Sequence, residues 1–241
     1  MKKFLALFVS VFMIFGVVGC GGGDSAPASG GDEKTSEAPA GISYQITDTR
    51  VKTWTDFLES QWVQTIVEIY NDGEENIYFT SGEYDLKDSA GNIVYTTEFA
   101  STYPEILAPG EYGYMYEETI IDNPVEGELT VDARPMAYEP KVDLVRLEVT
   151  DTECVEDEFY GYKFIGNVTN NTDTDYSMNY VVAELYDGED NFVGLATTLV
   201  SEDIPAGGSA PFEISTISLP DDVKEDFETY LVYCYPSQFN F

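Results

Sequence analysis

The chain has 241 residues, with 45 Asp and Glu against 11 Lys and Arg and no His, and its formal net charge is −34. This charge argues against binding of nucleic acid, because a phosphate backbone needs clustered Lys and Arg. The absence of His removes the commonest general base at neutral pH and His-ligated zinc. The acidity is typical of a solvated surface on an exported protein, and an acidic binding face is the alternative.

The chain begins with a segment that is typical of secretory signals. Lys2 and Lys3 precede the apolar run FLALFVSVFMIFGVV, which at about 15 residues is too short for a comfortable membrane span. The sequence Val17–Cys20 resembles the lipobox of bacterial lipoproteins, a family in which the signal is cleaved before a lipid-modified Cys. The resemblance implies that residues 1–19 are a lipoprotein signal peptide and that Cys20 carries the lipid. An ordinary secretory signal with an incidental Cys is the alternative.

Residues 20–41 are rich in Gly, Ser, Ala, Pro and charged residues and have almost no large apolar side chain. Such a segment cannot bury enough apolar surface to offset its ordering entropy, so we expect a disordered tether. A coil of about 20 residues would hold the folded part roughly 25 Å from the bilayer. We therefore expect a protein that is anchored to the cell membrane through Cys20 and faces the extracytoplasmic side.

Short alternating segments follow the tether and predict strands rather than helices. For example, Val63–Ile69 alternates apolar with mostly polar residues and stops at the turn sequence Asn71–Gly73. Several such segments, separated by turns, fill residues 42–140. This spacing predicts an antiparallel β-sandwich.

The second part of the chain repeats this pattern. Leu86 and Asp88 each have an identical residue 99 positions later, at Leu185 and Asp187. We expect both Leu side chains to point into a core and both Asp side chains to accept hydrogen bonds from backbone N–H groups in the following turn. A duplicated binding site is the alternative. The further identical pairs at the same spacing are Asn71 and Asn170, Asn92 and Asn191, and Val94 and Val193.

A family resemblance accompanies the repeat. Ala183–Asp187, preceded by a strand that ends in Gly166–Asn170 and followed by Pro205–Gly207 and Phe212, resembles the FxLYD domain, a small immunoglobulin-like β-sandwich of bacterial lipoproteins and secreted proteins. Tyr84–Asp88 is a looser match, and the leading Phe of the motif is replaced in both copies. The resemblance implies a fold more than a function, because the family has no general assigned activity.

These observations predict an all-β protein with two tandem immunoglobulin-like antiparallel β-sandwich domains after the signal peptide and the flexible linker. The first domain is expected over residues 42–140 and the second, FxLYD-like domain over residues 141–241. The two are expected to join near Glu139–Lys141. Only Asp221–Phe227 has helical spacing, for one or two turns at most.

Cys154 and Cys234 are the only thiols besides Cys20. Their positions near the two ends of the second repeat suit a disulfide in an exported protein. Closing that loop of about 80 residues would stabilise the fold by roughly 4 kcal/mol. Two separate buried thiols are the alternative.

Aromatic residues supply the candidate ligand site. Trp54 and Trp62 lie in or near a loop, where exposed rings could bind carbohydrate or peptide. Most of the 18 Tyr residues lie in predicted strands, where core packing is the default explanation. Tyr112, Tyr114 and Tyr116 are expected on one face of such a strand.

No metal, cofactor or catalytic site is predicted. The acidic segment Asp187–Asn191 fails as an EF-hand loop, because the glycine position is Phe192 and the last ligand position is Thr198. A looser calcium site made of several loops is the alternative. Paired carboxylates could hydrolyse a glycoside, but nothing in the sequence distinguishes one pair from the others.

The sequence thus predicts a non-catalytic, lipid-anchored surface protein that acts as a binding or spacing module for a protein or cell-wall partner. The alternative is a carbohydrate-binding lipoprotein that delivers glycan to a transporter or enzyme. In that case Trp54 and Trp62 would carry the ligand contacts.

Overall fold

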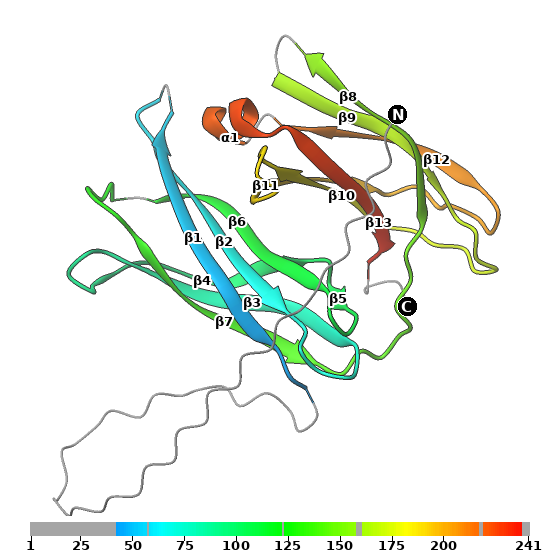
Figure 1. Cartoon of the computed structure of the whole chain (residues 1–241), viewed down its shortest axis with the longest axis horizontal. Coiled ribbons are helices and arrows are strands. Elements are labelled where there is room, and N and C mark those ends of the chain that lie inside the picture. Colours follow the sequence, from blue (N-terminus) through cyan, green and yellow to red (C-terminus); the bar gives the residue numbers. More distant parts are fainter. Residues whose placement is uncertain (1–41, 57, 122, 158–160, 217–218, 238–241) are drawn as a thin grey trace, which may run out of the picture. The chain divides into compact units, whose positions relative to one another are not determined.

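The computed structural model describes residues 42–56, 58–121, 123–157, 161–216 and 219–237, and all of them belong to one compact unit. The predicted signal peptide, the tether and Cys20 lie outside the described residues. Regular structure in the described part is almost entirely antiparallel β-sheet, so the all-β prediction is confirmed (Figure 1). None of the helices found there has the length and apolar character needed to cross a bilayer.

The first half of the fold has two sheets that share strand β4. One sheet has the order β1-β2-β6, and in the other β3 pairs with β4, β5 and β7. β4 pairs with β3 over its first part, and then Ser101–Tyr103 pairs with β6. The strands are β1 (Gln45–Thr55), β2 (Gln61–Tyr70), β3 (Ile77–Lys87), β4 (Ile93–Tyr103), β5 (Ile106–Leu107), β6 (Tyr112–Ile121) and β7 (Thr130–Tyr138).

The second half repeats this arrangement. β8, β9 and β12 form one sheet, in the places of β1, β2 and β6, and β11, β10 and β13 form the other, in the places of β4, β3 and β7. The predicted repeat is therefore visible in the strand order. The elements are β8 (Glu148–Asp157), β9 (Gly161–Thr169), β10 (Asn179–Tyr186), β11 (Phe192–Val200), β12 (Ser209–Ser215), α1 (Asp221–Asp226) and β13 (Thr229–Pro236).

Each half has its own apolar core between its two sheets. In the first half, Val67 of β2 and Met115 of β6 pack with Leu86 of β3. In the second half, Phe164 of β9 packs with Leu185 of β10. Leu86 and Leu185 are fully buried, which confirms the prediction that both point into a core.

The buried side chains of the repeated asparagines make hydrogen bonds to the backbone of the turns. The Asn71 amide is fully buried; its Nδ2 donates to the carbonyl oxygens of Glu75 (2.9 Å) and Leu107 (3.0 Å), and its Oδ1 accepts from the Gly73 N–H (3.0 Å). Asn170 is also fully buried and makes the same three kinds of bond in the second half. The two side chains thus satisfy backbone groups that the turns leave unpaired.

The repeated aspartates close the β3–β4 and β10–β11 hairpins. Asp88 Oδ1 accepts from the N–H groups of Ala90 (2.9 Å) and Asn92 (2.8 Å). Asp187 Oδ1 accepts from the N–H groups two and four residues further on, both at 2.9 Å. This confirms the role predicted for both residues. In each turn the side chain of the Asn four residues on is the largest cause that lowers the pKa of the Asp carboxyl.

A third apolar cluster joins the two halves. It contains Ile66 and Tyr114, from the outer face of the β1-β2-β6 sheet, and Val182, Phe192, Leu195 and Tyr235, from the outer face of the β11-β10-β13 sheet. The rings of Tyr114 and Phe192 stack with centroids 3.7 Å apart. The expected boundary near Glu139–Lys141 falls between β7 and β8, and the division into two domains stays a prediction.

The proposed disulfide between Cys154 and Cys234 is wrong in this structure, where both thiols are free. Cys234 of β13 bridges to Leu147, whose N–H donates to the Cys234 carbonyl at 2.9 Å. Cys154 is seven residues beyond Leu147, about 20 Å along an extended strand. A disulfide requires Cα atoms within about 7 Å of each other, so these thiols cannot pair. Burial raises the pKa of Cys154, and it raises that of Cys234 to about 12.

Candidate functional site

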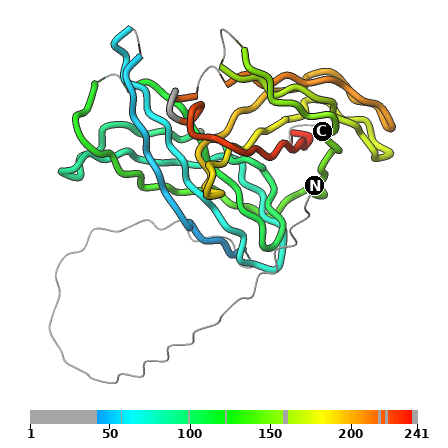
Figure 2. Tube along the Cα trace, turned by 45° about the horizontal axis from the view of Figure 1, so that its top comes forward, coloured from blue at the N-terminus to red at the C-terminus, as the bar shows by residue number. Residues whose placement is uncertain are grey.

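The β1–β2 hairpin ends in a turn that is built around Asp56. Asp56 Oδ1 accepts from the N–H groups of Leu58 (2.8 Å) and Ser60 (2.9 Å), and Glu59 adopts the left-handed conformation with φ of 65°. This is the same arrangement that Asp88 and Asp187 give to their own turns. The tip of the hairpin projects past the neighbouring strands of its sheet (Figure 2).

Trp54 and Trp62 lie directly opposite each other in this hairpin. Their rings stack at a centroid distance of 6.0 Å and an interplanar angle of 14°, and both side chains are half-buried. Trp62 Nε1 donates a hydrogen bond of 3.0 Å to Asp56 Oδ2. One carboxylate therefore fixes both the backbone of the turn and the orientation of an indole.

Two exposed aliphatic side chains occur near this pair, one on the strand next to Trp62 and one in the turn of the hairpin. Ile120 of β6 lies opposite Trp62 and is 45% exposed, and Leu58 at the tip of the turn is 69% exposed. Leu58, Trp54, Trp62 and Ile120 together are called the hairpin patch below. An exposed cluster of large apolar side chains on an otherwise strongly acidic protein is a candidate contact surface.

The hairpin patch is held on an ordered base. Gln61 Oε1 accepts from the Val125 N–H (2.7 Å), and Gln61 Nε2 donates to the Val125 carbonyl (3.0 Å), which ties the hairpin to the segment between β6 and β7. The hydrogen bond from Trp62 is the largest cause that lowers the pKa of Asp56. Asp56 thus stays ionised at neutral pH and remains a hydrogen-bond acceptor for the turn.

This arrangement can bind a ligand by stacking and apolar contact. The N–H of Trp62 is already occupied by Asp56, so the flat surface of its indole rather than this polar group is available to a ligand. Such surfaces suit the apolar face of a sugar ring or the side chains of a protein partner. In the part of the chain that the structure describes, no group of three or more Asp, Glu or Cys side chains is placed to hold a metal ion.

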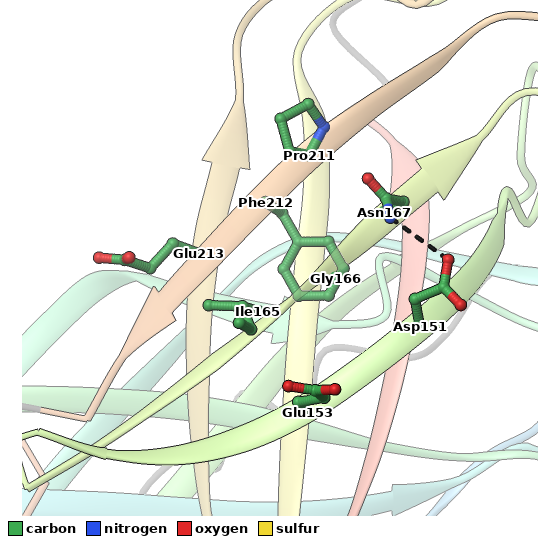
Figure 3. Close-up of a pocket in the computed structure, with 8 residues that line it drawn as sticks. All are labelled: Asp151, Glu153, Ile165, Gly166, Asn167, Pro211, Phe212 and Glu213. Atoms are coloured by element: carbon green, nitrogen blue, oxygen red, sulfur yellow. Dashed lines mark hydrogen bonds between the residues drawn. The ribbon is translucent and has the colours of Figure 1, made fainter.

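Besides the hairpin patch, the structure has a hollow on the outer face of the β8-β9-β12 sheet, with a volume of about 620 Å³ (Figure 3). It forms where β8 shifts register between Thr150 and Glu153. The hollow is shallow and carries three acidic side chains, of which Asp151 accepts a hydrogen bond from Asn167, so it encloses a ligand poorly. Its lining residues are Asp151, Glu153, Ile165, Gly166, Asn167, Pro211, Phe212 and Glu213.

Of the residues singled out in the sequence, Trp54 and Trp62 are brought together, whereas Cys154 and Cys234 are kept apart. Sequence reasoning missed Asp56, together with Leu58 and Ile120 of the patch. A signal for Asp56 was present, because its turn has the same length as the two Asp turns of the repeat. Leu58 and Ile120 join the patch only through the pairing of β1, β2 and β6.

No protein-family model matches the chain, and no curated protein matches it. The resemblance to the FxLYD domain and to bacterial lipoproteins therefore stays a prediction. So does the immunoglobulin-like character of the two halves.

Proposed function

We propose that this protein is a non-catalytic, lipid-anchored binding module of the extracytoplasmic cell surface, and that the hairpin patch is its contact surface for a protein or cell-wall partner. The stacked, half-exposed pair of Trp54 and Trp62 carries this proposal. Large aromatic side chains supply most of the binding energy in many interfaces, and ordered ones lose little entropy on binding.

The position of the patch in the chain supports surface display. The tether ends just before Gln45, where β1 begins, and the hairpin tip lies at the other end of this 11-residue strand. At about 3.3 Å per residue the two ends are roughly 35 Å apart. A lipid on Cys20 would thus hold the chain at one end of β1, and the patch would face a partner from the other end.

Carbohydrate is the second candidate ligand, and the near-parallel packing of two indoles favours it. Sugar rings bind to aromatic faces through their apolar C–H surfaces, and ligand hydroxyls can remain in water at an open site of this kind. In this case the protein would hold a glycan of the cell wall or deliver it to another protein.

Trp fluorescence gives a direct test, because Trp54 and Trp62 are the only Trp residues of the chain. The probes are purified cell-wall polymer, a set of oligosaccharides, and detergent-solubilised envelope protein, each titrated into residues 21–241. We expect a blue shift of the emission with at least one probe, because a bound ligand removes water from the indoles.

Trp54→Ala and Trp62→Ala test the patch. Tyr138→Ala is the control, because Tyr138 is an exposed aromatic residue on β7, outside the patch. Retention on the immobilised probe should fall at least tenfold in the Trp variants and remain unchanged in Tyr138→Ala. Equal retention by all variants would remove the hairpin patch from the function. Binding to the oligosaccharides alone would favour the carbohydrate candidate over a protein partner.

A further inference from the structure

Three polar side chains converge inside the core of the first half. Thr65 of β2 and Glu117 of β6 are cross-strand partners, and Tyr84 reaches them from β3 of the facing sheet. Thr65 is 1% exposed and Tyr84 is fully buried. The buried oxygens Thr65 Oγ1, Tyr84 OH and Glu117 Oε2 have no hydrogen-bond partner within 3.5 Å among the described residues.

The three groups are close enough to act on one another. Burial is the main cause that raises the pKa of Tyr84; the Thr65 hydroxyl opposes this rise, and the Glu117 carboxylate adds to it. The Tyr84 and Tyr95 rings lie 6.0 Å apart, and the Tyr95 hydroxyl donates a long hydrogen bond of 3.4 Å to Glu117 Oε1. The second oxygen of Glu117 is the one that faces the other two side chains without a partner.

The second half shows that the fold does not require these polar groups. Phe164 and Ile214 are cross-strand partners on β9 and β12, as Thr65 and Glu117 are on β2 and β6. Ala183 stands 99 positions after Tyr84, and Phe164 stands at the same spacing after Thr65. Phe164, Ala183 and Ile214 are all fully buried. The same place in the fold is thus apolar in one half and contains a carboxyl and two hydroxyls in the other.

Among the described residues, Glu117 forms no ion pair with the basic side chains of β1, which is the neighbour of β2 in this sheet. Arg50 and Lys52 lie on the opposite face of the sheet, since they pair with Ile66 and Gln64 rather than with the inward residues of β2. Glu117 is half-buried as a whole, but its Oε2 atom is shielded from solvent, and a shielded polar atom is normally hydrogen-bonded or bound to a cation. Carboxylate and hydroxyl oxygens are the donors that hard cations prefer.

We propose that Thr65, Tyr84 and Glu117 form a binding site for one small monovalent cation, with Na⁺ as the probe. A single positive charge neutralises the single carboxylate, and the two hydroxyls supply further oxygen ligands. This site is independent of the hairpin patch.

Thermal melts of residues 21–241 test the site, with Na⁺ replaced by tetramethylammonium at equal ionic strength. Saturating Na⁺ should raise the melting temperature of the wild type by about 5 °C. The rise should disappear in Glu117→Gln and shrink in Tyr84→Phe, which removes only the hydroxyl. Glu118→Gln should keep the full rise, because its side chain lies on the other face of the same strand. Melts in K⁺ and Ca²⁺ measure the selectivity.

²³Na NMR of the wild type is the second measurement and does not depend on the folding of any variant. Line broadening by the protein, reversed by competing K⁺, is the expected result. An equal response of wild type and Glu117→Gln to Na⁺ would overturn the proposal. So would a wild-type protein whose melting temperature does not respond to Na⁺. Neither result would bear on the Trp54 and Trp62 variants.

Discussion

Among single side chains, Asn71 and Asn170 show how one amide can determine a turn. Each lies at the end of an inner strand and is fully buried. Each satisfies two carbonyl oxygens and one N–H group of the loops around it. No other side chain combines two donors and an acceptor in so small a volume, which explains why the same residue stands at both places.

Replacing either Asn should therefore lower the free energy of unfolding. Asn71→Ala removes one hydrogen bond from the buried Leu107 carbonyl and one each from the partly buried Glu75 carbonyl and Gly73 N–H, and we expect the free energy of unfolding to fall by about 3 kcal/mol. Asn170→Ala should behave alike. Asn171→Ala is the control, because Asn171 is the exposed neighbour on the same turn, and a change within about 0.5 kcal/mol is expected. Urea denaturation measures all three, and comparable losses at Asn71 and Asn171 would contradict the role of burial.

The backbone conformation of the turns that begin at Asp56, Asp88 and Asp187 gives a second prediction. In each turn the residue three positions after the Asp is left-handed: Glu59 (φ 65°), Gly91 (φ 83°) and Asp190 (φ 64°). A side chain costs free energy in this conformation, so Glu59→Gly should stabilise the protein by about 0.5 to 1 kcal/mol. Gly91→Ala should destabilise it by about 1 kcal/mol through the backbone alone, since a Cβ at Gly91 meets no atom within 4 Å. Urea midpoints that move in the opposite directions would refute this interpretation.

The three hairpins that use these turns are local elements, and their stability depends on ionised aspartates. The pKa of Asp56, Asp88 and Asp187 is lowered in the folded protein by hydrogen bonds. A group whose pKa is lowered on folding contributes stability that is complete above its unfolded value of about 3.9. That contribution is lost as the pH falls through the folded value.

Asp187→Asn tests this dependence. The difference in urea midpoint between wild type and variant should be largest at pH 7 and should shrink as the pH falls below about 4. The difference is the useful quantity, because acid also relieves the repulsion among 45 carboxylates. Glu189→Gln, on the exposed part of the same turn, is the control and should give only a small difference at pH 7. A pH-independent difference for Asp187→Asn would mean that its charge is irrelevant to the turn.

Local patterns explain which of these elements the sequence could predict. The Asp turns and the buried leucines depend on a few adjacent residues, so Asp88, Asp187, Leu86 and Leu185 were predicted correctly. Trp54 and Trp62 were selected by residue type and loop position. The repeat does not indicate Asp56, because Val155 stands 99 positions later, although all three turns span the same number of residues.

Non-local geometry explains what the sequence could not predict. Cys154 and Cys234 flank the second repeat, but sequence spacing does not show that Cys154 lies far along β8 from the point where Cys234 meets Leu147. β6 is equally ambiguous, because Met115 enters the core while Tyr114 and Tyr116 on its other face are also large and apolar. Alternation cannot distinguish a second buried face from an exposed one.

In the molecule as a whole, that second face of β6 joins the two halves. Tyr residues from both halves lie in or against the third cluster: Tyr103, Tyr114, Tyr116, Tyr180, Tyr186, Tyr233 and Tyr235. Glu184 is buried nearby; burial raises its pKa, and the Tyr186 hydroxyl donates to it at 2.6 Å. Arg146, in the segment between β7 and β8, donates to the Ile106 carbonyl at 3.0 Å and lies over the Tyr235 ring. The many Tyr side chains thus make both apolar and polar contacts in the interface between the two halves.

This interface predicts that the two halves unfold together. The wild type should give a single calorimetric transition whose calorimetric and van't Hoff enthalpies agree. Phe192→Ala removes the ring that stacks on Tyr114 and lies under the Arg50 guanidinium, so it should lower the melting temperature and split the transition into two. Phe212→Ala removes the same volume from the second core and should lower the melting temperature by a similar amount. Because Phe212 belongs to the core of the second half and not to the cluster that joins the halves, that variant should keep one transition. A single transition in both variants would mean that the halves are coupled through the connecting segment and Arg146 rather than through the aromatic cluster.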